Sequence, residues 1–435
     1  MKKLYIKLSI VLLLISTSIF AQQTPGASQS ESILIIGVTA HIGNGTLIQN
    51  AAIGFNNGVL TFVGKQNEAD RNSFDKVINA EGHHVYPGFI VANSTSGLVE
   101  ISSVRATVDM DEVGQMLPHI RSLIAYNAES KITESLRPNG ILMGQISPRG
   151  GVISGTSSIV QFDAWNWQDA AIKIDEGIHA NWPTAIRNGK PWAGEKSGPT
   201  QDKAYAKSVD KVRQFLIEAK AYLTGNQSPR NLTLEATKGL FNGEKHFYIH
   251  VNGDKEIVDA VNFCNELGIP KLVIVNGREA HLVADVLVKN NVPVIIDRAH
   301  SLPSNSDEDI HFPYKRANIL TKAGVVVAIG IQGQMERMNS RNLPFYAGTY
   351  AAYGLGKEEA LKLITSNTAK ILGIDNIVGT LEVGKHATLF ISVGDALDMR
   401  TNILTKAYIQ GRELSLETHQ TKLWKRYMSK YDNQN

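Results

Sequence analysis

The sequence has only one cysteine among its 435 residues, so no disulfide can form within the chain. Charge of neither sign dominates, because 44 lysines and arginines stand against 41 aspartates and glutamates. Proteins that bind nucleic acid through its phosphates normally carry a clustered basic excess, so nucleic acid is not an expected partner. After the first 21 residues no apolar run is long enough to span a bilayer, so no membrane span is expected in the mature chain. Hydrophobic residues make up 43% of the chain, which is enough for a large folded core.

The N-terminal 21 residues have the pattern of a secretory signal peptide. Lys2 and Lys3 precede an apolar run, which ends in small residues and Ala21. We predict cleavage after Ala21 and an exported protein, periplasmic or secreted. The alternative is an uncleaved membrane anchor. Polar residues 16–18 interrupt the apolar run, which argues against this alternative. Residues 22–31 contain little that could be buried and are expected to form a flexible lead-in.

The pattern of apolar and polar residues changes twice along the rest of the chain. Residues 32–86 and 376–415 contain short apolar runs separated by Gly and Asn, which predicts a small antiparallel sheet built from both ends of the chain. Between them, residues 87–375 alternate strand-like and helical patterns, which is typical of a parallel sheet. About eight such units favour an α/β fold with a closed (β/α)8 TIM-like barrel.

Particular segments support this division. Helices are predicted over Asp254–Leu267 and Lys357–Leu372, each ending at a glycine. The lone Cys264 falls on the apolar face of the first of these helices and is expected in the core. The strand candidates are GFIVA, ILMGQI, SSIVQF, FYIHV, KLVIV, VPVII and VVVAIG.

The segment 416–435 is predicted to form a C-terminal amphipathic helix and tail. Its apolar side carries Trp424 and Tyr427, and its lysines and arginine lie elsewhere around the helix. We expect the apolar side to pack on the body of the protein, and attachment of the basic face to a membrane surface is the alternative.

Several strings resemble the amidohydrolase superfamily, the metal-dependent hydrolases that include dihydroorotase and imidazolonepropionase. VYPGFIVANST is similar to the segment that opens the family's barrel, KLVIVNGREAHLVADVL to a later strand and helix, and ITSNTAKILGI with VGTLEVGKHATLFI to the return into the small sheet. The resemblance implies a (β/α)8 barrel flanked by a β-sandwich made from both chain ends. It also implies hydrolysis of carbon–nitrogen bonds other than peptide bonds.

The family's metal ligands are mostly replaced in this chain. His250, at the end of FYIHV, matches a metal-binding histidine of the family and is the only retained ligand-type position. At the other matched positions the family's carboxylates and histidines are replaced by Val91, Asn93, Thr95, Asn276 and Gln332. Neutral amides and hydroxyls can hydrogen-bond a ligand, but they bind zinc poorly and supply no strong base. We therefore expect no cofactor, with one weakly bound zinc or other divalent metal as the alternative.

Three functions follow from this comparison. The first is an impaired or inactive amidohydrolase that binds a small molecule or peptide. The second is an active hydrolase with an atypical site around His250. The third is a non-catalytic subunit of a homo-oligomer, or of a hetero-oligomer with an intact amidohydrolase.

Other polar residues follow the ends of predicted strands. Asp297 and His300 are a hypothetical replacement acid/base pair, with a loop of solvated charges as the alternative. Asn252 and Arg298 are predicted to contact a ligand. Tryptophans that follow the Gly- and Ser-rich stretch SPRGGVISGTSSI are expected either to form an aromatic platform over the barrel mouth or to pack a loop; they are Trp165, Trp167, Trp182 and Trp192.

Overall fold

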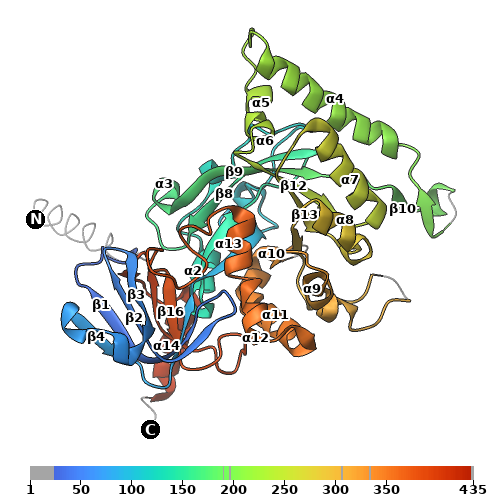
Figure 1. Ribbon diagram of the computed structural model, residues 1–435. Helices are drawn as coiled ribbons and strands as arrows, with labels where there is room; N and C mark the ends of the chain where they lie inside the picture. The colour runs from blue at the N-terminus through green and yellow to red at the C-terminus, as the bar shows by residue number, and fades with distance from the viewer. Residues whose placement is uncertain (1–23, 190, 195–196, 305–306, 333–334, 433–435) are drawn as a thin grey trace, which may run out of the picture.

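The computed structural model describes residues 24–189, 191–194, 197–304, 307–332 and 335–432 (Figure 1). The predicted signal peptide lies outside these residues. Within them, every helix is too short or too polar to cross a bilayer.

A small sheet is formed by strands from both ends of the described chain, drawn in blue and red in Figure 1. β1 pairs antiparallel with β2 but parallel with β4 and β5, so the sheet is mixed and the prediction of a purely antiparallel sheet was wrong. The tight turn between β2 and β3 uses Asn57 and Gly58, both with positive φ, as two-residue hairpins require. The strands are β1 Ile33–His41, β2 Leu47–Asn56, β3 Val59–Lys65, β4 Lys76–Asn79, β5 His84–Pro87, β16 Leu389–Ser392, β17 Leu404–Ile409 and β18 Arg412–Glu413.

The second eight-stranded sheet forms the barrel, which confirms the predicted α/β fold class. Its strands follow the chain in order around the barrel, and an isolated bridge between Ala92 and Gly330 joins the first strand to the last. All seven strand candidates within 87–375 form strands of this sheet. The sequence did not predict β9, nor the two short strands β10 Ile186–Asn188 and β11 Pro199–Gln201, which pair with each other outside the barrel. The barrel strands are β6 Phe89–Ser94, β7 Ile141–Ile146, β8 Ile153–Gln161, β9 Ala171–Asn181, β12 His246–Val251, β13 Leu272–Asn276, β14 Val294–Ile296 and β15 Val327–Ile329.

The barrel departs from eight repeated strand and helix units at its third strand. β8 runs antiparallel to both β7 and β9, whereas the other neighbouring pairs are parallel. Antiparallel neighbours need only short connections, so no crossover helix separates β7 from β8. As a result, the β7–β8 loop lies at the carboxyl ends of the parallel strands, and the β8–β9 loop lies at the opposite end.

Most helices cover the outside of the barrel (Figure 1). α7 spans Asp254–Leu267 and ends at Gly268 with φ 70°, as predicted, and it buries Cys264. The other helices named α are α2 Lys131–Leu136, α3 Trp167–Ala170, α4 Tyr205–Thr224, α5 Leu232–Glu235, α6 Lys238–Phe241, α8 Ala284–Lys289, α9 Phe312–Lys322, α10 Glu336–Asn339, α11 Leu343–Tyr350, α12 Lys357–Lys362, α13 Ser366–Leu372 and α14 His419–Asp432.

The helix predicted over 357–372 is two helices, α12 and α13. The carbonyl of Leu363 accepts a hydrogen bond from Ile329 N, and the carbonyl of Ile364 accepts one from Ile90 N. These two carbonyls satisfy N–H groups of the last and first barrel strands, which would otherwise remain unpaired at the seam. Tertiary hydrogen bonds therefore break a segment whose own pattern is helical. Ile371 and Leu372 of α13 then pack in one cluster with side chains of the barrel interior.

A buried ion-pair network connects the barrel to the small sheet. Arg137 Nη1 lies 2.7 Å from Asp163 Oδ1, and Arg412 Nη1 of β18 lies 3.2 Å from Asp163 Oδ2. The Asp163 and Arg137 side chains are only 2% and 5% exposed. Two guanidinium groups thus compensate one buried carboxylate at the junction.

α14 contacts α2 but leaves its apolar side open. Trp424 and Tyr427 are each 63% exposed and Tyr431 is 56% exposed. The expectation that this side packs on the protein body was therefore wrong.

Candidate active site at the barrel mouth

Two histidines face each other inside the barrel, near the carboxyl ends of the parallel strands. On β12 the alternation of the strand turns His246, Tyr248 and His250 toward the interior, while Phe247 and Ile249 join the outer core. His179 of β9 stands opposite Tyr248 in the strand register, with its ring stacked on the tyrosine ring. His179 Nδ1 lies 2.9 Å from His250 Nε2.

The chain of contacts continues at both ends of this pair. Gln332, the residue at the family's carboxylate position, places its Nε2 2.8 Å from His250 Nδ1. On the other side, His179 Nε2 lies 3.0 Å from Ser157 Oγ, and that hydroxyl donates to Glu176 Oε1 at 2.6 Å. Both ring nitrogens of His250 are therefore used in contacts within the protein.

Both histidines are held neutral. Burial, reinforced by the positive charge of Arg149, lowers the pKa of His250 to about 3. Burial, His250 and Arg149 lower the pKa of His179 well below its usual range. With neutral rings the hydrogen bonds run in one direction: the Gln332 amide donates to His250, His250 to His179, and His179 to Ser157.

Glu176 anchors the inner end of this chain. Burial acts to raise the pKa of Glu176, but neighbouring His246 and hydrogen bonds from Ser157 and Gln145 outweigh it, and the pKa is lowered. Tyr248 OH also donates to Glu176 Oε2 at 2.9 Å. The interior of the barrel thus contains one ionised carboxylate that is saturated with hydrogen-bond donors.

A guanidinium group sits among the replaced ligand positions of the first strand. Arg149, in the β7–β8 loop, donates to Asn93 Oδ1 at 3.1 Å and to the Asn93 carbonyl at 3.0 Å. It also pairs with Glu336 at 3.2 Å, and Thr95 Oγ1 donates to the same carboxylate at 2.8 Å. Asn93 is fully buried with φ 51°, and its Nδ2 has no hydrogen-bond partner among the described residues.

A cavity of about 300 Å³ opens beside His250. Asn252, one of the two predicted ligand contacts, lines it, and so does the buried Trp182. The cavity carries both signs of charge, because it is also lined by Asp254, Glu256, Arg278 and Glu279. A small molecule that carries charges of both signs matches these walls.

The remaining predicted residues lie apart from this arrangement. Asn276 ends β13 at the mouth. Asp297 Oδ1 accepts from the Arg298 backbone N–H, whereas His300 contacts Thr349 Oγ1 at 2.8 Å. The structure therefore does not bring Asp297 and His300 together as a hydrogen-bonded pair, and Arg298 does not line the cavity.

The tryptophans do not form a common platform. Trp165 and Trp167 lie in the connection between β8 and β9, and the reversal of β8 puts this connection at the end of the barrel opposite the mouth. Trp192 is 84% exposed, and only Trp182 reaches the mouth cavity.

These donors do not fit a catalytic metal. Among the described residues, no group of three or more His, Cys, Asp or Glu side chains is arranged to hold a metal ion. A metal at His250 Nε2 would have to displace the hydrogen bond with His179. It would also meet the fixed charge of Arg149, whose effect on both histidines opposes a second positive charge.

Comparison with known proteins finds similarity to one family. Residues 225–414 match the profile of the amidohydrolase family. The chain is 22% identical over 384 residues to a 5-methylthioadenosine/S-adenosylhomocysteine deaminase of Acetivibrio thermocellus, covering 79% of this chain and 81% of the relative. Together these matches support an amidohydrolase-family hydrolase that acts on carbon–nitrogen bonds.

Solved structures of the superfamily share the fold. An amidohydrolase from Thermotoga maritima MSB8 superposes with a TM-score of 0.74 at 22% identity, over 88% of this chain and 99% of the other. An adenosine deaminase from Xanthomonas campestris with bound zinc gives a TM-score of 0.54 at 14% identity, over 92% and 98% of the two chains.

The sequence analysis missed His179, Arg149 and Glu336. His179 lies on β9, the barrel strand that was not recognised, and alternation in IDEGIHAN is the signal that could have found it. Glu336 lies shortly after Gln332, the position that matches the family's carboxylate. Arg149 was noticed only as part of a loop, and its partner Asn93 is 56 residues away.

Proposed function

We propose that the barrel mouth binds a small molecule or short peptide and does not carry out metal-dependent hydrolysis. The observation that carries this proposal is the use of both His250 ring nitrogens, one by Gln332 and one by His179. The fixed Arg149 charge near Asn93 supports it, because a guanidinium repels a divalent cation. The charges around the cavity supply contacts for a bound ligand.

The test is metal content by mass spectrometry after purification without chelator, followed by incubation with excess zinc and manganese. We expect far less than one metal per chain and no change in melting temperature on adding a chelator. One metal per chain, lost together with stability on chelation, would contradict the proposal. Thermal-shift screening with amino acids, dipeptides and uncharged amides then tests binding at the mouth, with Asn252→Ala as the variant expected to weaken it.

One observation favours a catalytic alternative. His179 lies within hydrogen-bond distance of His250, so the two histidines could act together in an atypical catalytic site. This alternative predicts turnover of a small amide, cyclic amide or dipeptide that is abolished by His250→Asn and retained in His419→Asn, a change on the exposed C-terminal helix. Bound ligand without turnover would leave the binding function as the only one of the two.

We also propose that the protein is exported and that its signal peptide is cleaved after Ala21. Cell fractionation with N-terminal sequencing should then find mature chains that begin at Gln22 in the exported fraction. A chain that retains Met1 in the cytosol would overturn this proposal. Light scattering of the purified protein, alone and mixed with an intact amidohydrolase from the same cells, tests the subunit alternative.

A further inference from the structure

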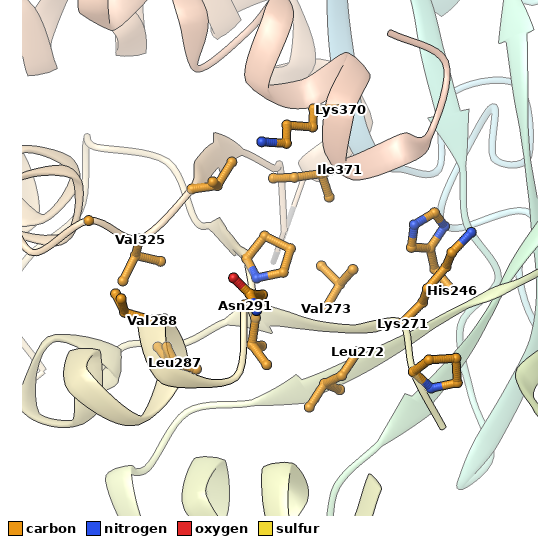
Figure 2. A pocket seen from close by; sticks show the side chains of 15 residues that line it. His246, Lys271, Leu272, Val273, Leu287, Val288, Asn291, Val325, Lys370 and Ile371 are labelled. Carbon is orange, nitrogen blue, oxygen red and sulfur yellow. The ribbon is translucent and has the colours of Figure 1, made fainter. Parts of the chain in front are cut away.

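A second cavity lies at the end of the barrel opposite the mouth (Figure 2). Its volume is about 390 Å³, and its walls come from the beginnings of β12 and β13, the segments before β14 and β15, the end of α8, and α13. His246 begins β12 and lines this cavity, whereas His250 near the end of the same strand lines the mouth cavity. The two cavities are therefore separate places on the barrel.

The polar side chains that line this cavity are basic or neutral. Lys271 and Lys370 line it from opposite sides in Figure 2, with His246 beside Lys271. No acidic residue is among its lining residues. Neither lysine ammonium has a hydrogen-bond or ion-pair partner in the part of the chain that the structure describes.

Nearby Lys173 shows a contrasting arrangement. Its Nζ donates to the carbonyls of Leu372 and Gly373 at 3.2 and 3.1 Å. Burial, together with the positive charge of Lys271, lowers the pKa of Lys173, and the carboxylates of Glu176 and Asp375 oppose this shift. Lys271 is thus close enough to Lys173 to repel it, so an added anion at the cavity would relieve repulsion between like charges.

The rest of the wall is apolar. Side chains of Leu287 and Val288 from α8 face Ile371 of α13 across the cavity (Figure 2), and Val273 packs in one cluster with Ile371. The volume lies within the range of pockets that hold small organic molecules. An anionic head near the lysines and an apolar body against the valines and leucines would each meet complementary groups.

We propose that this cavity binds a small organic anion with an apolar body, with its anionic group between Lys271 and Lys370. This inference is independent of the function proposed for the mouth. An acyl carboxylate and an alkyl phosphate share the required chemistry, and the test below separates them.

The test measures binding of octanoate and of octyl phosphate to the full mature chain by titration calorimetry. Octan-1-ol lacks the charge, and acetate and inorganic phosphate lack the apolar body. We expect saturable binding at one site per chain for at least one octyl anion, and at least tenfold weaker binding of all three controls. The octyl anion that binds more tightly shows whether the cavity prefers a carboxylate or a phosphate head group.

Three variants locate the site. The double change Lys271→Ala and Lys370→Ala should weaken binding at least tenfold, because it removes both charged donors. Val288→Trp should weaken it by filling the cavity, since this side chain is 40% exposed at the rim. Lys289→Ala, an exposed lysine next to Val288 that does not line the cavity, is the matched control and should bind like the wild type.

Three results would overturn the proposal. One is the absence of saturable binding by either octyl anion. Another is binding that is equal in the wild type and in both cavity variants, provided that circular dichroism shows them folded. Equal binding of acetate and octanoate would also refute it, because it would indicate attraction to surface charge without use of the cavity.

Discussion

The neutral histidine pair makes a quantitative prediction about stability and pH. An unfolded histidine has a pKa of about 6.5, whereas His250 in the folded protein has one of about 3. As the pH falls, His250 is therefore protonated more readily in the unfolded chain than in the folded protein. The stability contributed by neutral His250 is complete above about pH 6.5 and is lost as the pH falls toward 3. Each pH unit in this window costs about 1.4 kcal/mol, so at about pH 5 the loss is about 2 kcal/mol.

The perturbation is His250→Gln, which removes the titration and retains an amide that can hydrogen-bond to His179 and Gln332. Urea unfolding followed by tryptophan fluorescence gives the free energy of unfolding at several pH values between about 5 and 8. Between about pH 7 and pH 5 the wild type should lose about 2 kcal/mol more than the variant. Other titrating groups are present in both proteins and cancel in this difference.

His419→Gln on exposed α14 is the control and should follow the wild type. Parallel pH dependence of the wild type and His250→Gln would refute the reasoning, because it would show that His250 can be protonated in the folded protein at no cost. A chelator that reproduced the effect of the substitution would point instead to a bound metal.

Two further substitutions test the junction and the C-terminal helix. Arg137→Ala leaves the buried Asp163 with one guanidinium fewer and should lower the free energy of unfolding by about 3–5 kcal/mol, whereas Arg400→Ala, in an exposed ion pair, should leave the urea midpoint unchanged. A midpoint for Arg137→Ala equal to that of the wild type would contradict the assigned role of the network. Trp424→Ala should change the free energy of unfolding by no more than about 0.5 kcal/mol because its side chain is 63% exposed, and a loss of several kcal/mol would show that α14 packs against the protein.

The strands that could be predicted are those whose apolar character is continuous. FYIHV and KLVIV are buried on both faces of the barrel wall, and their sequences show it directly. β9 carries Lys173, Asp175 and Glu176 in one strand, so its local pattern indicates a polar loop. Asp175 also has a φ of 52°, which interrupts regular alternation there. Lys173 and Asp175 stay partly exposed, whereas Glu176 is buried among its hydrogen-bond donors, which lie on other strands.

Site residues could be predicted at the positions that the family motifs mark. Residues outside those motifs could not. Alignment of motifs identified His250 and the replacements Asn93 and Gln332. It could not show that Arg149 bonds to Asn93, because the two residues are 56 positions apart and no motif of the family marks Arg149. The sequence left open whether Trp165 and Trp167 form a platform over the mouth or pack a loop, and the reversal of β8 puts them at the opposite end of the barrel.

The hydrogen bonds at the barrel seam also impose an order on folding. Ile90 lies in the chain's first barrel strand, but its N–H donates to the carbonyl of residue 364 in a sequence of 435 residues. During synthesis, the edge of β6 must therefore stay open until most of the chain has emerged. Contacts between such distant residues form slowly, and open strand edges are prone to pair with other chains. Nascent chains of this protein are thus expected to depend on protection from association until the segment between α12 and α13 closes the seam.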